Sequence, residues 1–162
     1  MRLDTDTLEN DLEDLFRQLF AREVDNGSVT LFIESARGGR TGRSVSVRPK
    51  SSCSAPVVGY AENGDDIVYL TTGRNTVLEV PIKGRRYTKF EGAEELIKLI
   101  QAVAAGNFEE TLWLRDSEPV RSVGRIFVDE GAPIEIRTSS AFTNPFASSE
   151  KKTCRYLPYS AG

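Results

Sequence analysis

The sequence contains no histidine, only two cysteines, and no apolar run long enough to span a lipid bilayer. Without imidazole the chain cannot build a Ser-His-Asp triad, a Cys-His pair or an imidazole-ligated zinc site. Two cysteines are also too few for a tetrathiolate metal site. Acid–base chemistry near neutral pH would fall to a carboxylate, lysine or thiol with a shifted pKa. We therefore predict no cofactor, no metal and no catalytic residue, and expect binding rather than catalysis.

The N-terminal residues are also without the basic stretch and apolar stretch that together mark a signal peptide. We accordingly expect a cytoplasmic protein that does not associate with membranes. In a reducing compartment Cys53 and Cys154 are expected to remain thiols. The oligomeric state, monomer or dimer, is left open by these observations.

What the chain does contain is an ordinary globular composition with an uneven distribution of charge. Its 162 residues are 39% hydrophobic and 28% charged, which suits one folded domain. The net charge of −3 argues against a non-specific nucleic-acid binder, so we consider nucleic acid an unlikely partner. Residues 1–25 carry −5, and the remainder carries +2. This acidic segment is either a docking face for a basic partner or a solvated helix face.

Two segments have helical periodicity. Apolar residues recur three and four apart over residues 8–23, and a second such pattern runs from Thr88 to a C-terminal glycine at Gly106. The first pattern is made by Leu8, Leu12, Leu15, Phe16, Leu19 and Phe20, and the second by Phe90, Ile97, Ile100, Val103 and Ala104.

Short β-branched and aromatic runs separated by turn residues predict the strands. They cover residues 29–34, 44–48, 57–62, 67–72, 76–82, 110–115, 122–129 and 133–138. Tight turns join them, so the predicted class is α+β, a mostly antiparallel sheet of about six to eight strands with two main helices. The predicted order is α-βββββ-α-βββ. Residues 1–138 would form a single domain, and residues 139–162 an extended strap docked by its aromatics or a partly disordered tail.

Acidic residues gather at two predicted hairpin tips. Glu62, Asp65 and Asp66 occupy the first tip, and Asp129 and Glu130 occupy the second. A pair of catalytic carboxylates needs a cleft that desolvates at least one of them, and an exposed tip seldom supplies it. We interpret these five residues as an acidic surface that binds a partner, with simple turn chemistry as the alternative.

A glycine-rich basic loop covers residues 37–43 and includes Arg40 and Arg43. It does not match a phosphate-binding loop, because a strand rather than a helix is predicted to follow it. We treat Arg40 and Arg43 as further candidate partner-binding residues, or as part of a solvated loop. Trp113 stands between two leucines, so we predict that it belongs to the core.

In size, acidity and α+β order, the chain resembles bacterial immunity proteins, which neutralise a cognate polymorphic toxin. The resemblance concerns architecture and composition and carries over no residue. It implies a protein partner, such as a toxin domain, whose active site is occluded by a negatively charged surface. Secretion chaperones, which are commonly dimers, share the same order of elements and are the alternative. A histidine-free enzyme that uses carboxylates or Cys53, and nucleic-acid binding through residues 37–50, are weaker hypotheses.

Overall fold

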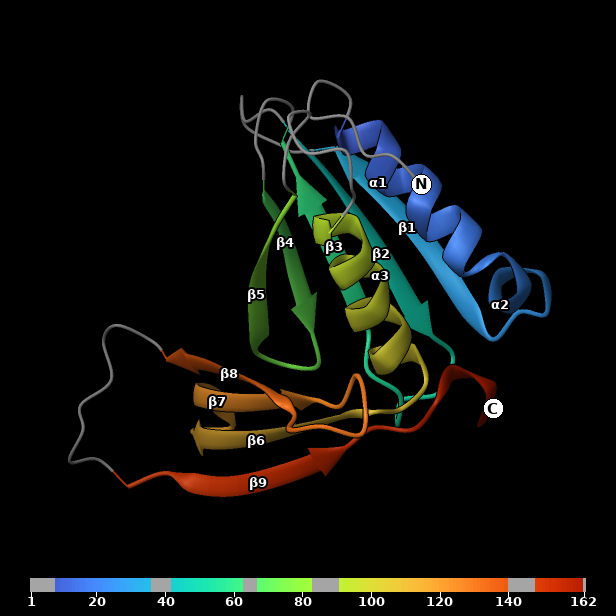
Figure 1. The fold of residues 1–162 in the computed structure, drawn as a ribbon. Coiled ribbons are helices and arrows are strands. Elements are labelled where there is room, and N and C mark those ends of the chain that lie inside the picture. Colours follow the sequence, from blue (N-terminus) through green and yellow to red (C-terminus); the bar gives the residue numbers. More distant parts are fainter. Residues whose placement is uncertain (1–7, 36–41, 63–66, 83–90, 140–147, 162) are drawn as a thin grey trace.

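The computed structural model describes residues 8–35, 42–62, 67–82, 91–139 and 148–161, which form helices on one side of a first sheet and a second, smaller sheet below it (Figure 1). The helices are α1 (Leu8–Leu19), α2 (Ala21–Asp25) and α3 (Glu91–Ala104), and a 3-10 turn covers Tyr159–Ala161. The strands are β1 (Val29–Ser35), β2 (Arg43–Pro49), β3 (Val57–Ala61), β4 (Ile67–Thr72), β5 (Thr76–Pro81), β6 (Phe108–Arg115), β7 (Glu118–Ile126), β8 (Ile134–Ser139) and β9 (Glu150–Arg155).

The first sheet is a five-stranded antiparallel meander in the order β1-β2-β3-β4-β5. Consecutive strands pair because the chain between them is too short for a crossover. Pro81 ends β5 at an edge of this sheet, where its missing N–H leaves no hydrogen bond of the ladder unmade.

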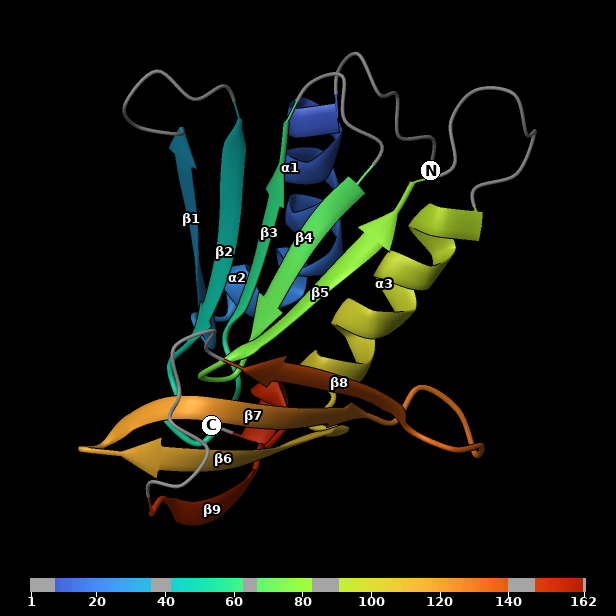
Figure 2. The ribbon, with the colours of Figure 1, turned by 90° about the vertical axis from the view of Figure 1, so that its left-hand side faces the viewer.

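Both long helices lie on the same face of the first sheet, and no described helix covers its other face, here called the open face (Figure 2). The buried face of the sheet carries Val45, Val47, Val57, Val68 and Leu70, which all have 0% exposure. The helix α1 approaches β3 closely, because a Cβ at Gly59 would lie 3.1 Å from the ring of Phe16. The apolar periodicity predicted for this helix is confirmed by the burial of Leu12, Leu15, Phe16 and Phe20.

The second sheet is a four-stranded antiparallel sheet in the order β8-β7-β6-β9. Strand β9 follows β8 in sequence but pairs with β6, so the last strand closes the opposite edge. The register between β6 and β7 shifts between Trp113 and Leu114, beside the tight turn at Asp116 and Ser117, whose φ values are positive. These strands run beneath the turn that joins β4 to β5 (Figure 1).

Helix α3 ends where the sequence placed its terminating glycine. Gly106 has φ of +79°, and its N–H donates to the carbonyl of Val103 while the N–H of Asn107 donates to Ala102. This pair of hydrogen bonds is the Schellman arrangement, which satisfies the last carbonyls of a helix. Thr88, where the predicted helical pattern begins, lies outside the described residues.

The C-terminal segment contains a strand that the sequence did not predict. The sequence predicts only an extended strap or a partly disordered tail over residues 139–162, and β9 lies within this segment. The aromatics that follow it do dock as expected. Tyr156 stacks on Phe108 with ring centroids 5.1 Å apart, and Tyr159, only 3% exposed, donates from its hydroxyl to the carbonyl of Ala55 at 2.7 Å. Phe142 and Phe146 lie outside the described residues.

The predicted α+β class with antiparallel strands is confirmed, although the strands divide between two sheets instead of one. The predicted helix over residues 8–23 is broken at Phe20 into α1 and α2. Among the described helices, none combines the length and the apolar character needed to cross a membrane.

Candidate functional site

The second acidic tip predicted from the sequence directly follows Val128, which lines a cleft. Asp129 and Glu130 are exposed in the turn between β7 and β8. Glu62, directly after β3, is half-buried and accepts a hydrogen bond from the hydroxyl of Tyr60. Asp65 and Asp66 lie outside the described residues, so the first tip is represented by Glu62 alone.

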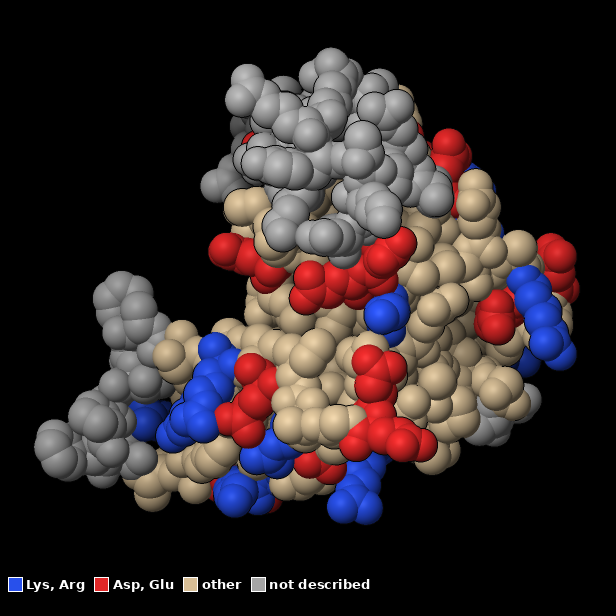
Figure 3. Space-filling model, in the orientation of Figure 1, with Lys and Arg blue, Asp and Glu red and all other residues tan. Residues whose placement is uncertain are grey.

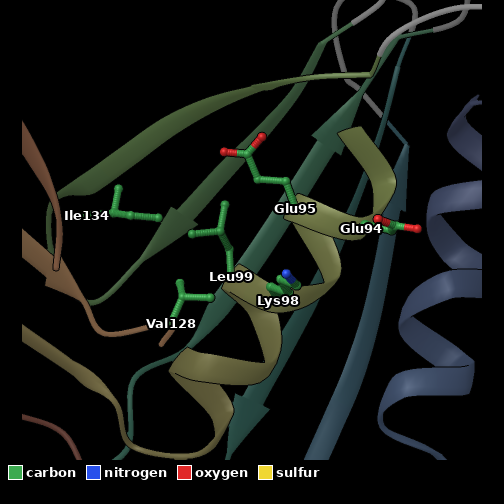
Figure 4. A pocket seen from close by; sticks show the side chains of 6 residues that line it. All are labelled: Glu94, Glu95, Lys98, Leu99, Val128 and Ile134. Carbon is green, nitrogen blue, oxygen red and sulfur yellow. The ribbon is translucent and has the colours of Figure 1, made fainter. Parts of the chain in front are cut away.

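The cleft has a volume of about 270 Å³ and lies between α3 and the β7–β8 connection (Figure 4). Leu99 of α3 points toward Val128 and Ile134, and these three side chains form an apolar floor. Leu99 is buried, whereas Ile134 is 39% exposed and offers an accessible apolar surface. The remaining lining residues, Glu94, Glu95 and Lys98, project from the exposed side of α3.

Acidic side chains surround this cleft on two sides. Glu94 and Glu95 stand on α3, and Asp129 and Glu130 directly follow the lining residue Val128. In Figure 3, red side chains gather in the middle of this face, in an upper row and a lower group. An apolar floor between carboxylates can take an apolar side chain from a partner while the rim attracts the partner's bases.

Of the two arginines predicted to bind a partner, only Arg43 lies among the described residues. Arg40 lies outside the described residues. Arg43, at the start of β2, donates to Glu13 of α1 at 2.7 Å and to Asn10 at 2.9 Å. Its guanidinium therefore holds α1 against the first sheet. Arg48 also contacts a residue of its own chain, with its guanidinium 4.5 Å from the ring centroid of Phe32 on the open face.

The prediction that Trp113 belongs to the core is wrong. Alternation along β6 buries Leu112 and Leu114 but turns Trp113 to the outer face of the second sheet, where it is half-buried. Arg121 of β7 and Lys151 of β9 are paired with it across the sheet, 4.6 Å and 5.7 Å from a ring centroid of the indole. Both cations gain from the electron-rich ring face.

Three more arginines on this outer face form ion pairs with two glutamates. Arg125 contacts Glu109 at 3.2 Å and Glu135 at 3.1 Å, while Arg137 and Arg155 pair with Glu135 and Glu109 respectively. Figure 3 shows the resulting mixture of blue and red over the second sheet at lower left. Because glutamates interrupt the row of arginines, this face does not offer a continuous track for a phosphate backbone.

Glu110, the one fully buried carboxylate among the described residues, has a structural role. Glu110, at 0% exposure, accepts hydrogen bonds from the N–H groups of Arg74 and Asn75 and from the hydroxyls of Thr76 and Tyr156. With all its partners inside the protein, it has no access to a substrate. Both cysteines are free thiols, Cys53 exposed and Cys154 half-buried. In the part of the chain that the structure describes, no group of three potential metal ligands occurs.

Sequence reasoning missed the α3 side of the cleft. Glu94, Glu95 and Lys98 lie on the exposed side of the helix, where the sequence alone does not distinguish a binding residue from a solvated one. A usable signal was present at the other side, where Val128 and Ile134 bracket the acidic turn in the sequence. Apolar residues next to an exposed acidic turn indicate a mixed surface rather than a simple solvated hairpin.

Comparison of the chain with protein-family models, with curated proteins and with solved structures finds no match in any of the three.

Proposed function

We propose that the protein binds a cognate protein partner, such as a toxin domain, and neutralises it by occlusion. The observation that carries this proposal is the cleft between α3 and the β7–β8 turn, with its apolar floor and its acidic rim. Ile134 offers the kind of accessible apolar surface on which a protein interface can be built.

The expected partner presents an apolar or aromatic side chain flanked by lysine or arginine. The anchor would fill the space above Leu99, Val128 and Ile134, where displacement of water supplies most of the affinity. The carboxylates of Glu94, Glu95, Asp129 and Glu130 would steer the basic surface toward the cleft and raise the association rate. A basic surface of this kind is typical of domains that act on nucleic acid.

The test begins with the protein encoded beside this chain, which is expressed with and without it. If the neighbour is toxic, the wild-type chain should restore growth and form a complex with it that survives gel filtration. Replacing two acids of the rim, E94K with E95K, should reduce the association rate at least tenfold at low salt. The matched control is E79K with E118K, which changes the net charge equally, since Glu79 and Glu118 are exposed glutamates that do not line the cleft.

A loss of neutralisation in both the E94K/E95K and the E79K/E118K proteins would show that the change in net charge, and not the cleft, is responsible. Neutralisation that persists unchanged in the E94K/E95K protein and in Ile134→Asp would exclude this cleft as the binding site. If the chain neither binds nor protects against its encoded neighbour, the proposed function is wrong.

A further inference from the structure

Among the four edge strands that the structure describes, β1 alone has neither a proline nor more than one charged residue. Edge strands are usually blunted by proline or by charged side chains, which prevent pairing with another chain. Strand β5 ends in Pro81, β9 carries Lys151 and Lys152, and β8 carries Glu135 and Arg137. The seven residues of β1 hold one charge, Glu34. In Figure 2, no described element lies beyond β1 on the outer side of the sheet.

The register shows which backbone groups of β1 face this free edge. The N–H of Lys50 donates to the carbonyl of Ser28 at 2.8 Å, and the next pair along is Val29 with Pro49. In an antiparallel ladder hydrogen-bonded pairs alternate with non-bonded ones, so residues 30, 32 and 34 bond to β2. The N–H and C=O groups of Leu31 and Ile33 therefore point outward, without a backbone partner among the described residues.

A groove runs beside this edge. It has a volume of about 600 Å³ and is lined by Arg17, Ala21, Val24, Asp25, Gly27, Val29, Thr30 and Leu31. Val24 is 40% exposed on the helix side of the groove, and Phe32 is 39% exposed on the opposite, open face of the sheet. The free edge is thus bordered on both faces by apolar side chains that remain accessible.

We propose that β1 pairs with β1 of a second copy of this chain, forming a symmetric dimer with one continuous ten-stranded sheet. In an antiparallel, two-fold arrangement, the outward N–H and C=O groups of Leu31 bond to those of Ile33 in the second copy. By symmetry, the same groups of Ile33 bond to Leu31 of the second copy. The two Phe32 side chains then face each other on the two-fold axis as a non-bonded pair, with Cβ atoms roughly 5 Å apart.

The charges near the edge are complementary under the same symmetry. Glu34 falls opposite Thr30 of the second copy, and Arg48 is the cross-strand neighbour of Thr30. All three side chains lie on the open face, and threonine is short enough for Glu34 to reach Arg48 across it. Each dimer would therefore contain two reciprocal Glu34–Arg48 contacts between copies. This self-complementarity favours pairing of β1 with a second copy of the chain over pairing with a strand of unrelated sequence.

Sedimentation equilibrium of the full chain at about 100 μM tests the proposal, with an expected mass close to twice 17.9 kDa. Ile33→Pro removes an N–H that bonds to nothing within the described chain, so it should abolish dimers while leaving the folded monomer. Ile33→Ala loses the same side chain but keeps that N–H, and should still dimerise. Circular dichroism and thermal unfolding establish that each variant is folded.

Two further variants decide the outcome if Ile33→Pro does not fold. Phe32→Glu places two like charges on the symmetry axis at an exposed position and should weaken dimerisation at least tenfold. Glu34→Arg should weaken it as well, and the swap E34R with R48E should restore it. A wild-type chain that sediments as a monomer, or a dimer unaffected by I33P and F32E, would overturn the proposal. The edge lies apart from the α3 cleft, so neutralisation by a monomer would leave the proposed function intact.

Discussion

The carboxylate of Glu110 on β6 accepts a hydrogen bond of 2.9 Å from the backbone N–H of Asn75 in the turn between β4 and β5. A second bond of the same length comes from the N–H of Arg74. One buried side chain of the second sheet thus holds a turn of the first sheet. The two sheets share no strand, so this contact is a main point at which their relative position is fixed.

Replacing Glu110 by alanine should destabilise the protein strongly. The substitution leaves two backbone N–H groups and the hydroxyl of Thr76 buried without an acceptor, which should cost about 3 kcal/mol or more in the free energy of unfolding. Glu110→Gln keeps one acceptor oxygen and should fall between alanine and wild type. Urea denaturation measures the change, with Glu109→Ala on the outer face as the control. Equal losses at positions 109 and 110 would contradict the role assigned to the buried network.

The contact between the two sheets also includes a glycine that should not tolerate a larger side chain. A Cβ at Gly124 would lie 2.5 Å from Oγ1 and 2.6 Å from Cγ2 of Thr76, the residue that bonds Glu110. We expect Gly124→Ala to cost about 2–3 kcal/mol through overpacking. Gly131→Ala is the matched control, since nothing lies within 4 Å of a Cβ there. If both alanine variants unfold at the same denaturant concentration, the close packing of the two sheets is not as described.

Alkaline pH should destabilise the protein through its docked tyrosine. Burial raises the pKa of Tyr159 well above the value of about 10 found in unfolded chains. The folded state therefore keeps the phenol proton that the unfolded state releases. This stabilising contribution is complete below pH 10 and is lost as pH rises from there toward the folded pKa, by at most about 1.4 kcal/mol per pH unit.

The variant Tyr159→Phe tests this dependence. It should be less stable at neutral pH by about 1 kcal/mol, because the hydrogen bond to Ala55 is lost. Above pH 10 its stability should fall less steeply than that of the wild type. Denaturation midpoints measured from pH 8 to 11 give both quantities. Parallel curves for the two proteins would rule out ionisation of Tyr159 as a cause of alkaline unfolding.

The strands of the first sheet could be predicted because turn residues flank them and apolar residues alternate along most of them. Strand β4 shows this most clearly, since Val68, Leu70 and Thr72 face the core while the residues between them face outward. Strand β9 could not be found in this way. Its residues are exposed or half-buried and mostly charged, and its position comes from backbone pairing with β6. The local sequence of β9 does not indicate that β6 is its partner.

The misplacement of Trp113 has a related cause. Composition favoured a buried tryptophan between two leucines, but strand geometry permits only alternate residues to face the core. Leu112 and Leu114 both being buried forces Trp113 to the other side. The candidate cleft could be predicted only in part. Asp129 and Glu130 could be identified from the sequence as an exposed acidic turn. That this turn lies near Glu94 and Glu95 depends on how α3 packs beside the second sheet.

The contact between Arg121 and Trp113 yields a prediction that intrinsic fluorescence can check. Trp113 is the only tryptophan, and the guanidinium of Arg121 covers its ring at 4.6 Å. Arg121→Ala should expose the ring, so that acrylamide quenches the emission more strongly, while stability falls by less than about 1 kcal/mol. Arg137→Ala is the control, because Arg137 is on the same sheet but pairs with Glu135. Quenching that is unchanged in Arg121→Ala, or that rises equally in the control, would show that Arg121 does not shield the indole in solution.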